Sequence, residues 1–284
     1  MMTSGEAQVT GKGPFMGKSS WQDKFIPLQG GLSLDDFRGR SGNLVVISPH
    51  PDDDVLGAGG VMIGAAEEGR GVFSVTVTDG RGSPQKGPNI SEEEMVERRQ
   101  KESMAALKVV GAAGGFYFRR RNSDLDEQEG KEVEKDLKEL LEWLTPDEVY
   151  LPAPYERHKT HQRVTRLTVE ALRSSTASEP FLFGYSLWGG FFGEKKRLVK
   201  DISPFIRKKV EAVLAHSTQI AYKNYQQGIL GRNNADAIFW ESHDIQRVSF
   251  VETFLNLTEL LERKNLSLDN FIREDVESFI RAFL

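Results

Sequence analysis

The sequence contains no cysteine, and this absence removes several kinds of chemistry at once. Disulfide bonds, iron–sulfur clusters, thiolate zinc sites and a cysteine nucleophile are all excluded. Any bound metal ion must therefore be held by histidine and carboxylate side chains. The chain offers five histidines and 42 acidic residues for that purpose.

The sequence also lacks the features that direct a protein to membranes or nucleic acids. No apolar run is long enough to span a bilayer, and the N-terminus has no apolar signal core. The 37 basic residues are outnumbered by the 42 acidic ones, which gives a net charge of −5. This balance favours neither nucleic acid nor an anionic membrane as a partner, and a cytoplasmic protein is expected.

A chain of 284 residues suits one large α/β domain or two small ones. Residues 1–20 are rich in glycine, serine, threonine and lysine, which is typical of a mobile tail. Residues 21–40 are amphipathic and are expected to pack on the domain edge. We therefore divide the sequence into a tail and edge segment, 1–40, and a single domain, 41–284, with a helical C-terminal part.

Short apolar runs alternate with amphipathic stretches along this domain. The runs predict strands at 43–48, 72–78, 116–118, 148–152 and 181–188. The stretches predict helices at 55–69, 91–110, 131–144, 160–174, 203–225 and 257–284. The alternation predicts an α/β fold with a doubly wound, mostly parallel, Rossmann-like sheet and helices on both faces. Ligands of such sheets bind outside the C-terminal ends of the strands.

The turn PHPDDD at residues 49–54 directly follows the first strong strand. His50 and Asp53 are three residues apart and Pro51 makes the turn rigid, so both side chains can point at one cation. Imidazole and carboxylate together suit Zn²⁺ without sulfur. The alternative is a solvated acidic turn that caps the next helix. The position at a strand end and the presence of a histidine favour the metal site.

A second cluster follows the strand at 148–152 and contains His158 and His161. A pair of histidines three residues apart is weak evidence by itself. Because the sheet topology brings this strand end next to the turn at residues 49–54, the two clusters together provide three protein ligands. The fourth position then remains for water, as in catalytic zinc sites.

Residues 49–60, with the sequence PHPDDDVLGAGG, resemble the signature of the LmbE-like, or PIG-L-like, N-deacetylases. The resemblance covers residues 43–254 and includes several further segments. These are VTDGRG at 77–82, RQKE at 99–102, HKTH at 158–161 and the stretches 209–219 and 251–254. Members of that family act on N-acetylglucosaminyl groups, for example in chitobiose or in precursors of thiol cofactors and GPI anchors.

The resemblance implies a function and a set of roles. It implies a zinc-dependent hydrolase that removes an N-acetyl group from a small amino sugar or its conjugate, and family members often form homo-oligomers. The implied zinc ligands are His50, Asp53 and His161. Asp52 is the implied general base, and His158 is the implied protonated partner of the oxyanion and a candidate general acid.

The residues that recognise the substrate are less clearly marked. Asn122 stands where the family has a substrate-binding aspartate, with Asp124 close by to compensate, and Arg81 lies on a loop at a strand end. These three are the candidate substrate-binding residues. Arg99 is expected to be a structural ion-pair partner. Thr160 stands where the family has an aspartate between the two histidines, which predicts the loss of an orienting carboxylate.

Two other functions remain open at this stage. Gly57, Gly59 and Gly60 favour a nucleotide-binding Rossmann enzyme, with Asp79 near the place of a ribose-binding acid, although Met62 stands where the last glycine of that fingerprint belongs. The other alternative is a zinc-binding protein of the same fold without catalysis. Intact Asp52 and His158 argue against it, because holding a metal ion requires neither.

Two histidines and one aromatic segment have no assigned role. His216 and His243 are expected to be surface or packing residues. The segment 185–192 holds four aromatic residues, and it is expected to form either a corner of the core or part of a wall that stacks on sugar.

Overall fold

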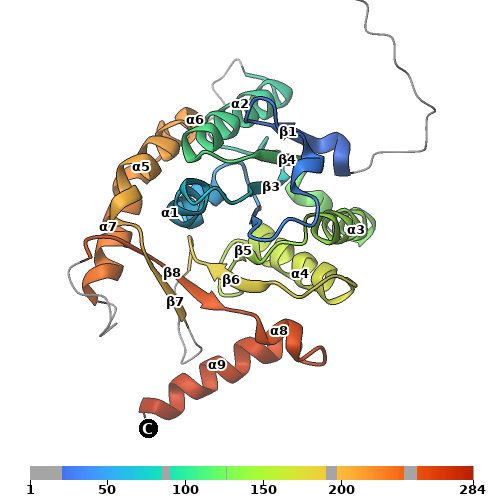
Figure 1. Cartoon of the computed structure of the whole chain (residues 1–284). Coiled ribbons are helices and arrows are strands. Elements are labelled where there is room, and N and C mark those ends of the chain that lie inside the picture. The colour runs from blue at the N-terminus through green and yellow to red at the C-terminus, as the bar shows by residue number, and fades with distance from the viewer. Residues whose placement is uncertain (1–20, 85–89, 126, 190–196, 240–247, 284) are drawn as a thin grey trace, which may run out of the picture.

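An eight-stranded sheet runs through the molecule, and helices pack on both of its faces (Figure 1). The computed structural model describes residues 21–84, 90–125, 127–189, 197–239 and 248–283. The order of strands across the sheet is β1-β4-β3-β2-β5-β6-β8-β7. The strands are β1 Phe25–Pro27, β2 Leu44–Ser48, β3 Val72–Thr78, β4 Gly114–Arg120, β5 Glu148–Pro152, β6 Phe181–Tyr185, β7 Arg197–Asp201 and β8 Val251–Asn256.

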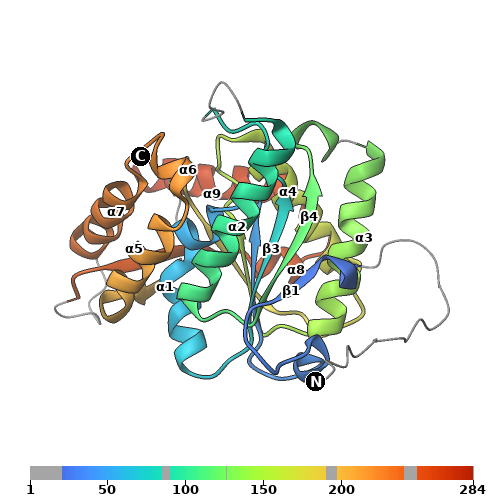
Figure 2. The ribbon, with the colours of Figure 1, turned by 90° about the horizontal axis from the view of Figure 1, so that it is seen from above.

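The helices form two layers, one on each side of the sheet (Figure 2). They are α1 Asp53–Glu67, α2 Glu92–Val110, α3 Glu127–Leu144, α4 Lys159–Arg173, α5 Ile206–Leu214, α6 Ser217–Ile220, α7 Tyr225–Phe239, α8 Glu259–Glu262 and α9 Leu268–Phe283. Short 3₁₀ turns are η1 Trp21–Lys24, η2 Leu34–Phe37, η3 Asn122–Leu125 and η4 Ser203–Phe205. None of the helices formed by the described residues has the length and apolar character needed to span a bilayer.

Each layer of helices buries its own apolar cluster against the sheet. Side chains of α1, α2, α5 and α7 pack with one face of β2. Side chains of α3, α4, α8 and α9 pack with the other face, which includes Val45 and Ile47 of β2. Every residue of β2 and β3 is buried, as expected for central parallel strands that are covered on both sides. The prediction of a doubly wound, mostly parallel sheet is confirmed.

The order of the strands places a topological switch point between β2 and β5. The chain runs from β2 to β3 and β4 on one side, and then from β5 to β6 on the other, and these five strands are parallel. The loops that follow β2 and β5 therefore leave the sheet in opposite directions and open a crevice at its carboxyl edge. The predicted metal turn and the predicted histidine pair follow these two strands.

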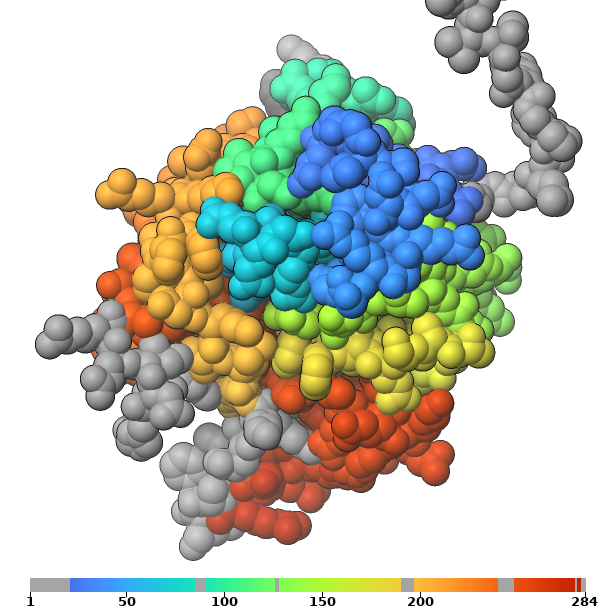
Figure 3. All heavy atoms as spheres, in the orientation of Figure 1, coloured from blue at the N-terminus to red at the C-terminus, as the bar shows by residue number. Residues whose placement is uncertain are grey.

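The segment after residue 20 packs against the domain edge, as expected. The ring of Trp21 lies 6.0 Å from that of Phe116 and 5.5 Å from that of Trp143. The next strand, β1, pairs antiparallel with β4. This segment, blue in Figure 3, lies on the surface of the molecule. Residues 1–20, the expected mobile tail, lie outside the described residues.

The C-terminal part differs from the helical region that the sequence predicts. The expected helix at 203–225 is divided into η4, α5 and α6, and α7 follows it. Two strands extend the sheet beyond β6: β8 pairs antiparallel with β6, and β7 pairs antiparallel with β8. The apolar pattern of β8 is interrupted by a buried glutamate, Glu252, so its sequence is not typical of a buried strand. The expected helix at 257–284 is divided into α8 and α9.

Glu252 is compatible with the core because a buried lysine neutralises it. Lys209 of α5 places its Nζ 2.6 Å from Oε1 of Glu252 and 3.1 Å from Oδ1 of Asn233. The carboxylate also accepts hydrogen bonds from the backbone N–H groups of Gly60 and Val61 in α1. This network joins β8, α5 and α7 to the helix that begins at the metal turn.

Lys209→Met is expected to lower the free energy of unfolding by about 3–5 kcal/mol, because it leaves the Glu252 carboxylate buried without its cation. Urea titration would measure the loss. Lys208→Met is the matched control: Lys208 is 39% exposed and only 3.3 Å from an exposed Glu67, so the expected change is below about 1 kcal/mol. Equal stability of the two variants would show that the buried pair does not hold the C-terminal part in place.

Candidate metal centre

The turn after β2 is fixed by hydrogen bonds on both of its sides. The backbone carbonyl of Pro49 accepts from the N–H and the hydroxyl of Thr78, at 2.9 and 2.7 Å. Ser48 donates its hydroxyl to the carbonyl of His50 and accepts from the N–H of Asp54. These bonds hold the turn in place relative to β2 and β3, so His50 and Asp53 keep fixed positions at the start of α1.

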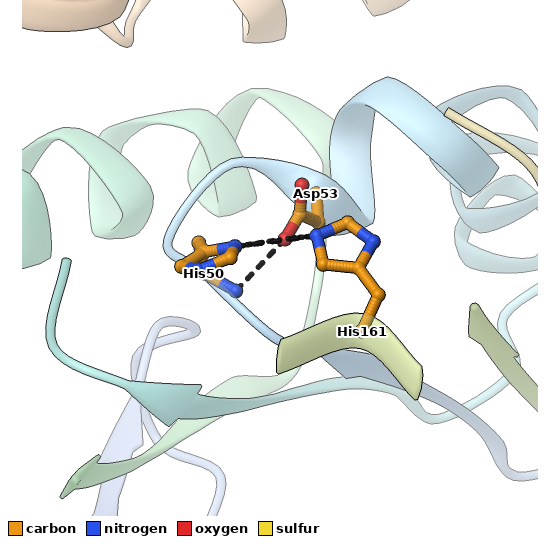
Figure 4. A group of neighbouring side chains, drawn as sticks. All are labelled: His50, Asp53 and His161. Atoms are coloured by element: carbon orange, nitrogen blue, oxygen red, sulfur yellow. Dashed lines mark hydrogen bonds and ion pairs between the residues drawn. The ribbon is translucent and has the colours of Figure 1, made fainter. Parts of the chain in front are cut away.

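His50, Asp53 and His161 point toward one another, the first two from the turn and the third from α4 (Figure 4). Oδ2 of Asp53 lies 2.9 Å from Nδ1 of His50 and 3.1 Å from Nε2 of His161. The two ring nitrogens are 3.3 Å apart. Among the described residues, this is the group of three whose donor atoms converge closely enough to hold a metal ion.

The spacing of these donor atoms fits a small divalent ion. A tetrahedral ion bound at about 2.0–2.1 Å needs ligand atoms about 3.3 Å apart. Two imidazole nitrogens that face each other cannot both carry a hydrogen on that side, so at least one presents a lone pair. Two imidazoles with one carboxylate, and no sulfur, are a donor set that such an ion accepts.

The carboxylate and the imidazoles of the triangle shift one another's pKa values. Burial alone would raise the pKa of Asp53, but His161 and His50 hold it well below its usual range. Burial alone would lower the pKa of His161, but Asp53 and Glu156 raise it to about 10. The centre thus favours positive charge next to an ionised carboxylate, which is the environment that a divalent cation requires.

Asp52 lies beside the triangle and is held by an arginine. Its Oδ1 accepts from Nη2 of Arg99 at 3.0 Å, and both side chains are buried. Burial raises the pKa of Asp52, although the Arg99 guanidinium acts in the opposite direction. Arg99 also donates to the carbonyl of Gly80. Gly80 has φ +68°, and a Cβ there would lie 2.3 Å from Nη1 of Arg99, so a side chain at this position would displace the guanidinium.

His158 is the N-cap residue of α4 and stands next to two of the candidate ligands. Its ring centroid is 4.9 Å from that of His50 and 5.1 Å from that of His161. Burial, together with the charge on these neighbouring imidazoles, lowers the pKa of His158. The five residues implied by the resemblance are therefore brought together from two distant segments of the chain.

His50, Asp52, Asp53 and His158 line an open cleft of about 250 Å³, and His161 lies buried behind them. Asn122 lines the cleft, and its buried Oδ1 has no hydrogen-bond partner among the described residues. The other two candidates for substrate binding, Arg81 and Asp124, are not among the described residues that line it. Arg81 instead pairs with Asp79 and Glu92.

Two residues that line the cleft are absent from the predicted site. Arg99 forms an ion pair, as expected, and its partner is Asp52 in the cleft. Glu102 of α2 accepts hydrogen bonds from Ser217 and Thr218 of α6, next to Gln219, which lines the cleft. The segment RQKE at 99–102 is the signal that could have identified both contacts.

The unassigned histidines have different outcomes. His216 is a packing residue, 2% exposed, and neither ring nitrogen has a hydrogen-bond partner among the described residues. Burial lowers its pKa to about 3, so the ring is neutral. His243 lies outside the described residues, as do residues 190–192 of the aromatic segment. Within that segment Tyr185 is a core residue, whereas Trp188 lines the cleft.

Comparison with known proteins places these features in a family. The family described as "PIG-L: GlcNAc-PI de-N-acetylase" matches residues 45–172. This range contains His50, Asp52, Asp53, His158 and His161. The diacetylchitobiose deacetylase of Thermococcus kodakarensis is 26% identical over 188 residues, covering 62% of this chain and 69% of that protein.

Solved structures show the same fold. N,N'-diacetylchitobiose deacetylase from Pyrococcus horikoshii superposes with a TM-score of 0.65 and 22% identity, over 78% of this chain and 86% of that one. The 4-carboxy-2-hydroxymuconate hydratase GalB from Pseudomonas putida KT2440 superposes with a TM-score of 0.64 and 18% identity, over 76% and 95%. The fold therefore supports more than one reaction, and the reaction must be argued from the site. Residues 45–172 therefore match the PIG-L family, and the chain has the fold of the LmbE-like deacetylases.

Proposed function

We propose that this protein is a zinc-dependent hydrolase that removes the N-acetyl group from an N-acetylglucosamine-type amino sugar or conjugate. The observation that carries the proposal is the triangle of His50, Asp53 and His161 at the sheet's switch point, with Asp52 and His158 in the same cleft. A bound zinc ion supplies a water of lowered pKa and polarises the amide carbonyl.

The side chains account for the movement of protons. Oδ1 of Asp52 is held by Arg99, which leaves the second oxygen to take a proton from the attacking water. Asp52 is also the N-cap residue of α1, whose positive end favours the ionised carboxylate. Water adds to the amide carbon, the C–N bond breaks, and acetate and a free amine result. A protonated His158 donates to the developing oxyanion and gives its proton to the leaving amine, while the proton taken up by Asp52 returns to solvent.

The test is a deacetylation screen with metal-free and zinc-loaded protein. N-acetylglucosamine, N,N'-diacetylchitobiose and an N-acetylated peptide would be compared by acetate release. We expect zinc-dependent acetate release from the sugars and none from the peptide. A protein that holds stoichiometric zinc but releases no acetate from any amino sugar would contradict the proposal and favour a metal-binding protein without this catalysis.

The nucleotide-binding alternative loses support from the packing of the glycines. A Cβ on Gly57 would lie 2.4 Å from the ring of Tyr185, and a Cβ on Gly60 would lie 2.4 Å from Ile202. The lack of a side chain at these two positions thus permits close packing of α1 against its neighbours. Thermal protection by a dinucleotide, without protection by zinc, would reverse this conclusion.

A smaller depression adjoins the cleft and gives room for a substrate longer than one sugar. Leu56, Trp188 and Tyr225 line both the main cleft and a smaller depression of about 140 Å³. Trp188 is 38% exposed, and its ring lies 6.3 Å from that of Tyr225. Exposed aromatic faces of this kind suit the apolar face of a second sugar ring. Gly228 of α7 also lines the depression.

Gly228→Leu is expected to lower kcat/KM for N,N'-diacetylchitobiose by at least about tenfold while leaving that for N-acetylglucosamine unchanged. A Cβ at Gly228 meets no atom within 4 Å, so the added side chain enters the depression and not the core. Gly231→Leu is the matched control, because it is equally open and on the same helix but does not line the depression. An equal effect of Gly228→Leu on both sugars would show that the depression holds no part of the substrate.

A further inference from the structure

Glu156, in the loop between β5 and α4, is a buried carboxylate that the proposed reaction does not use. Its residue exposure is 1%, and its side chain is fully enclosed. A carboxylate in such a place is costly unless nearby donors compensate it. The donors that surround Glu156 come from two parts of the site: the imidazole of His161 and the backbone at Leu187 and Trp188.

The contact with His161 concerns the ring nitrogen that faces away from the metal triangle. Nε2 of His161 lies against Asp53 and His50, so Nδ1 must carry the hydrogen when Nε2 acts as a ligand. Nδ1 forms no hydrogen bond of standard geometry with any described residue, and Oε2 of Glu156 lies 3.3 Å from it. Glu156 is therefore the acceptor available to that N–H.

This arrangement gives His161 a neighbouring carboxylate although residue 160 is a threonine. Thr160 stands where the resembled family has an aspartate between its histidines, but a carboxylate reaches His161 from five residues earlier in the chain. A carboxylate on the outer nitrogen of a metal-bound imidazole fixes the tautomer and the direction of the ring. The substitution of Thr160 thus leaves the third ligand oriented.

The second contact of Glu156 concerns the wall of the cleft. Oε1 accepts from the backbone N–H of Leu187 at 2.6 Å, and the N–H of Trp188 is shared between Oε1 at 3.2 Å and Oε2 at 3.0 Å. Trp188 is shared by the main cleft and the smaller depression. One carboxylate therefore ties the third metal ligand to the backbone that carries the aromatic wall.

We propose that Glu156 is a positioning residue that orients His161 for zinc through Oε2 and holds the Leu187–Trp188 wall chiefly through the bond from Leu187 to Oε1. The inference rests on the proposed function, because it takes the ion at His161 to be zinc. It goes beyond that function in joining metal binding to the shape of the sugar-facing wall through one side chain.

Two substitutions separate the two contacts. Glu156→Gln keeps the size of the side chain and an oxygen at the Oε1 position, which accepts from the amides of Leu187 and Trp188. Its NH₂ group takes the place of Oε2, which faces His161 and is the second acceptor for Trp188. Glu156→Ala removes both contacts. Zinc affinity, measured by competition with a chromophoric chelator at fixed pH, is expected to fall by about 10–100-fold in both variants. Quenching of the Trp188 fluorescence by acrylamide measures how exposed this ring is, and therefore reports the position of the Leu187–Trp188 wall.

The fluorescence readout requires a subtraction, because the chain has four tryptophans. Quenching of each variant is compared with that of the same variant carrying Trp188→Phe, and the difference belongs to Trp188. We expect this difference to match that of the wild type in Glu156→Gln and to rise in Glu156→Ala. Glu170→Gln, on the exposed side of α4, is the control and is expected to change neither quantity.

The outcomes distinguish this inference from the proposed function. If the wild-type protein binds no zinc, both are contradicted. If the wild type binds zinc and Glu156→Gln binds it equally well, the proposed function stands and the orienting role of Glu156 is overturned. If the quenching of Trp188 is the same in Glu156→Ala as in the wild type, the link to the wall is overturned.

Discussion

Asp52→Asn is expected to lower kcat for deacetylation by about 10²–10⁴-fold while the protein keeps stoichiometric zinc. The introduced amide would still accept a hydrogen bond from Arg99 through its oxygen, so the cleft keeps its shape. It would have no basic oxygen for the proton of the attacking water. Zinc remains because the three donor atoms that converge belong to His50, Asp53 and His161.

The neighbouring aspartate provides a control for the loss of negative charge. Asp54 is also buried, but its carboxylate accepts from the hydroxyl of Ser74 and from the N–H of Val55, away from the cleft. Burial raises its pKa to about 6, so the neutral side chain is well tolerated there. Asp54→Asn is therefore expected to keep both zinc and activity. Loss of zinc from Asp52→Asn would mean that Asp52 is a ligand and that the base has been assigned wrongly.

The centre of the fold could be predicted because its strands are buried on both faces. The sequences of β2 and β3 are mostly apolar runs, and the rule that ligands bind at the carboxyl ends of parallel strands then located the turn at residues 49–54 and the histidines after β5. The edge of the sheet could not be predicted in the same way. β8 contains Glu252, which is buried only because Lys209, 43 residues earlier in the chain, neutralises it.

The same limit applies to the residues that support the site. The proposed ligands and the proposed base lie in two short motifs. Several of the groups that hold these motifs in place lie far from them in the sequence. Arg99 is 47 residues from Asp52 in sequence, and the amides of Leu187 and Trp188 are 31 and 32 residues from Glu156. Pairings of this kind depend on how helices and loops pack around the crevice. A local sequence pattern can therefore identify the reacting groups, but not the distant groups that hold them in place.

His161→Ala is expected to lower zinc affinity by more than the roughly 10–100-fold that an outer carboxylate contributes, because it removes one of three protein ligands. Competition with a chromophoric chelator would measure the change. His158→Ala is the informative comparison, since His158 lies in the same motif and within 5.1 Å of His161, ring to ring, but outside the triangle of donor atoms.

His158→Ala is therefore expected to retain zinc and to lose activity, and His161→Ala to lose both. Both variants remove an imidazole from the start of α4, but only the ring of His161 belongs to the triangle of donor atoms. The contrast between them therefore tests the assignment more sharply than either variant alone. The opposite result, zinc lost from His158→Ala and kept in His161→Ala, would exchange the two roles. It would also remove the reason for a carboxylate at Glu156, since that side chain faces the outer nitrogen of His161.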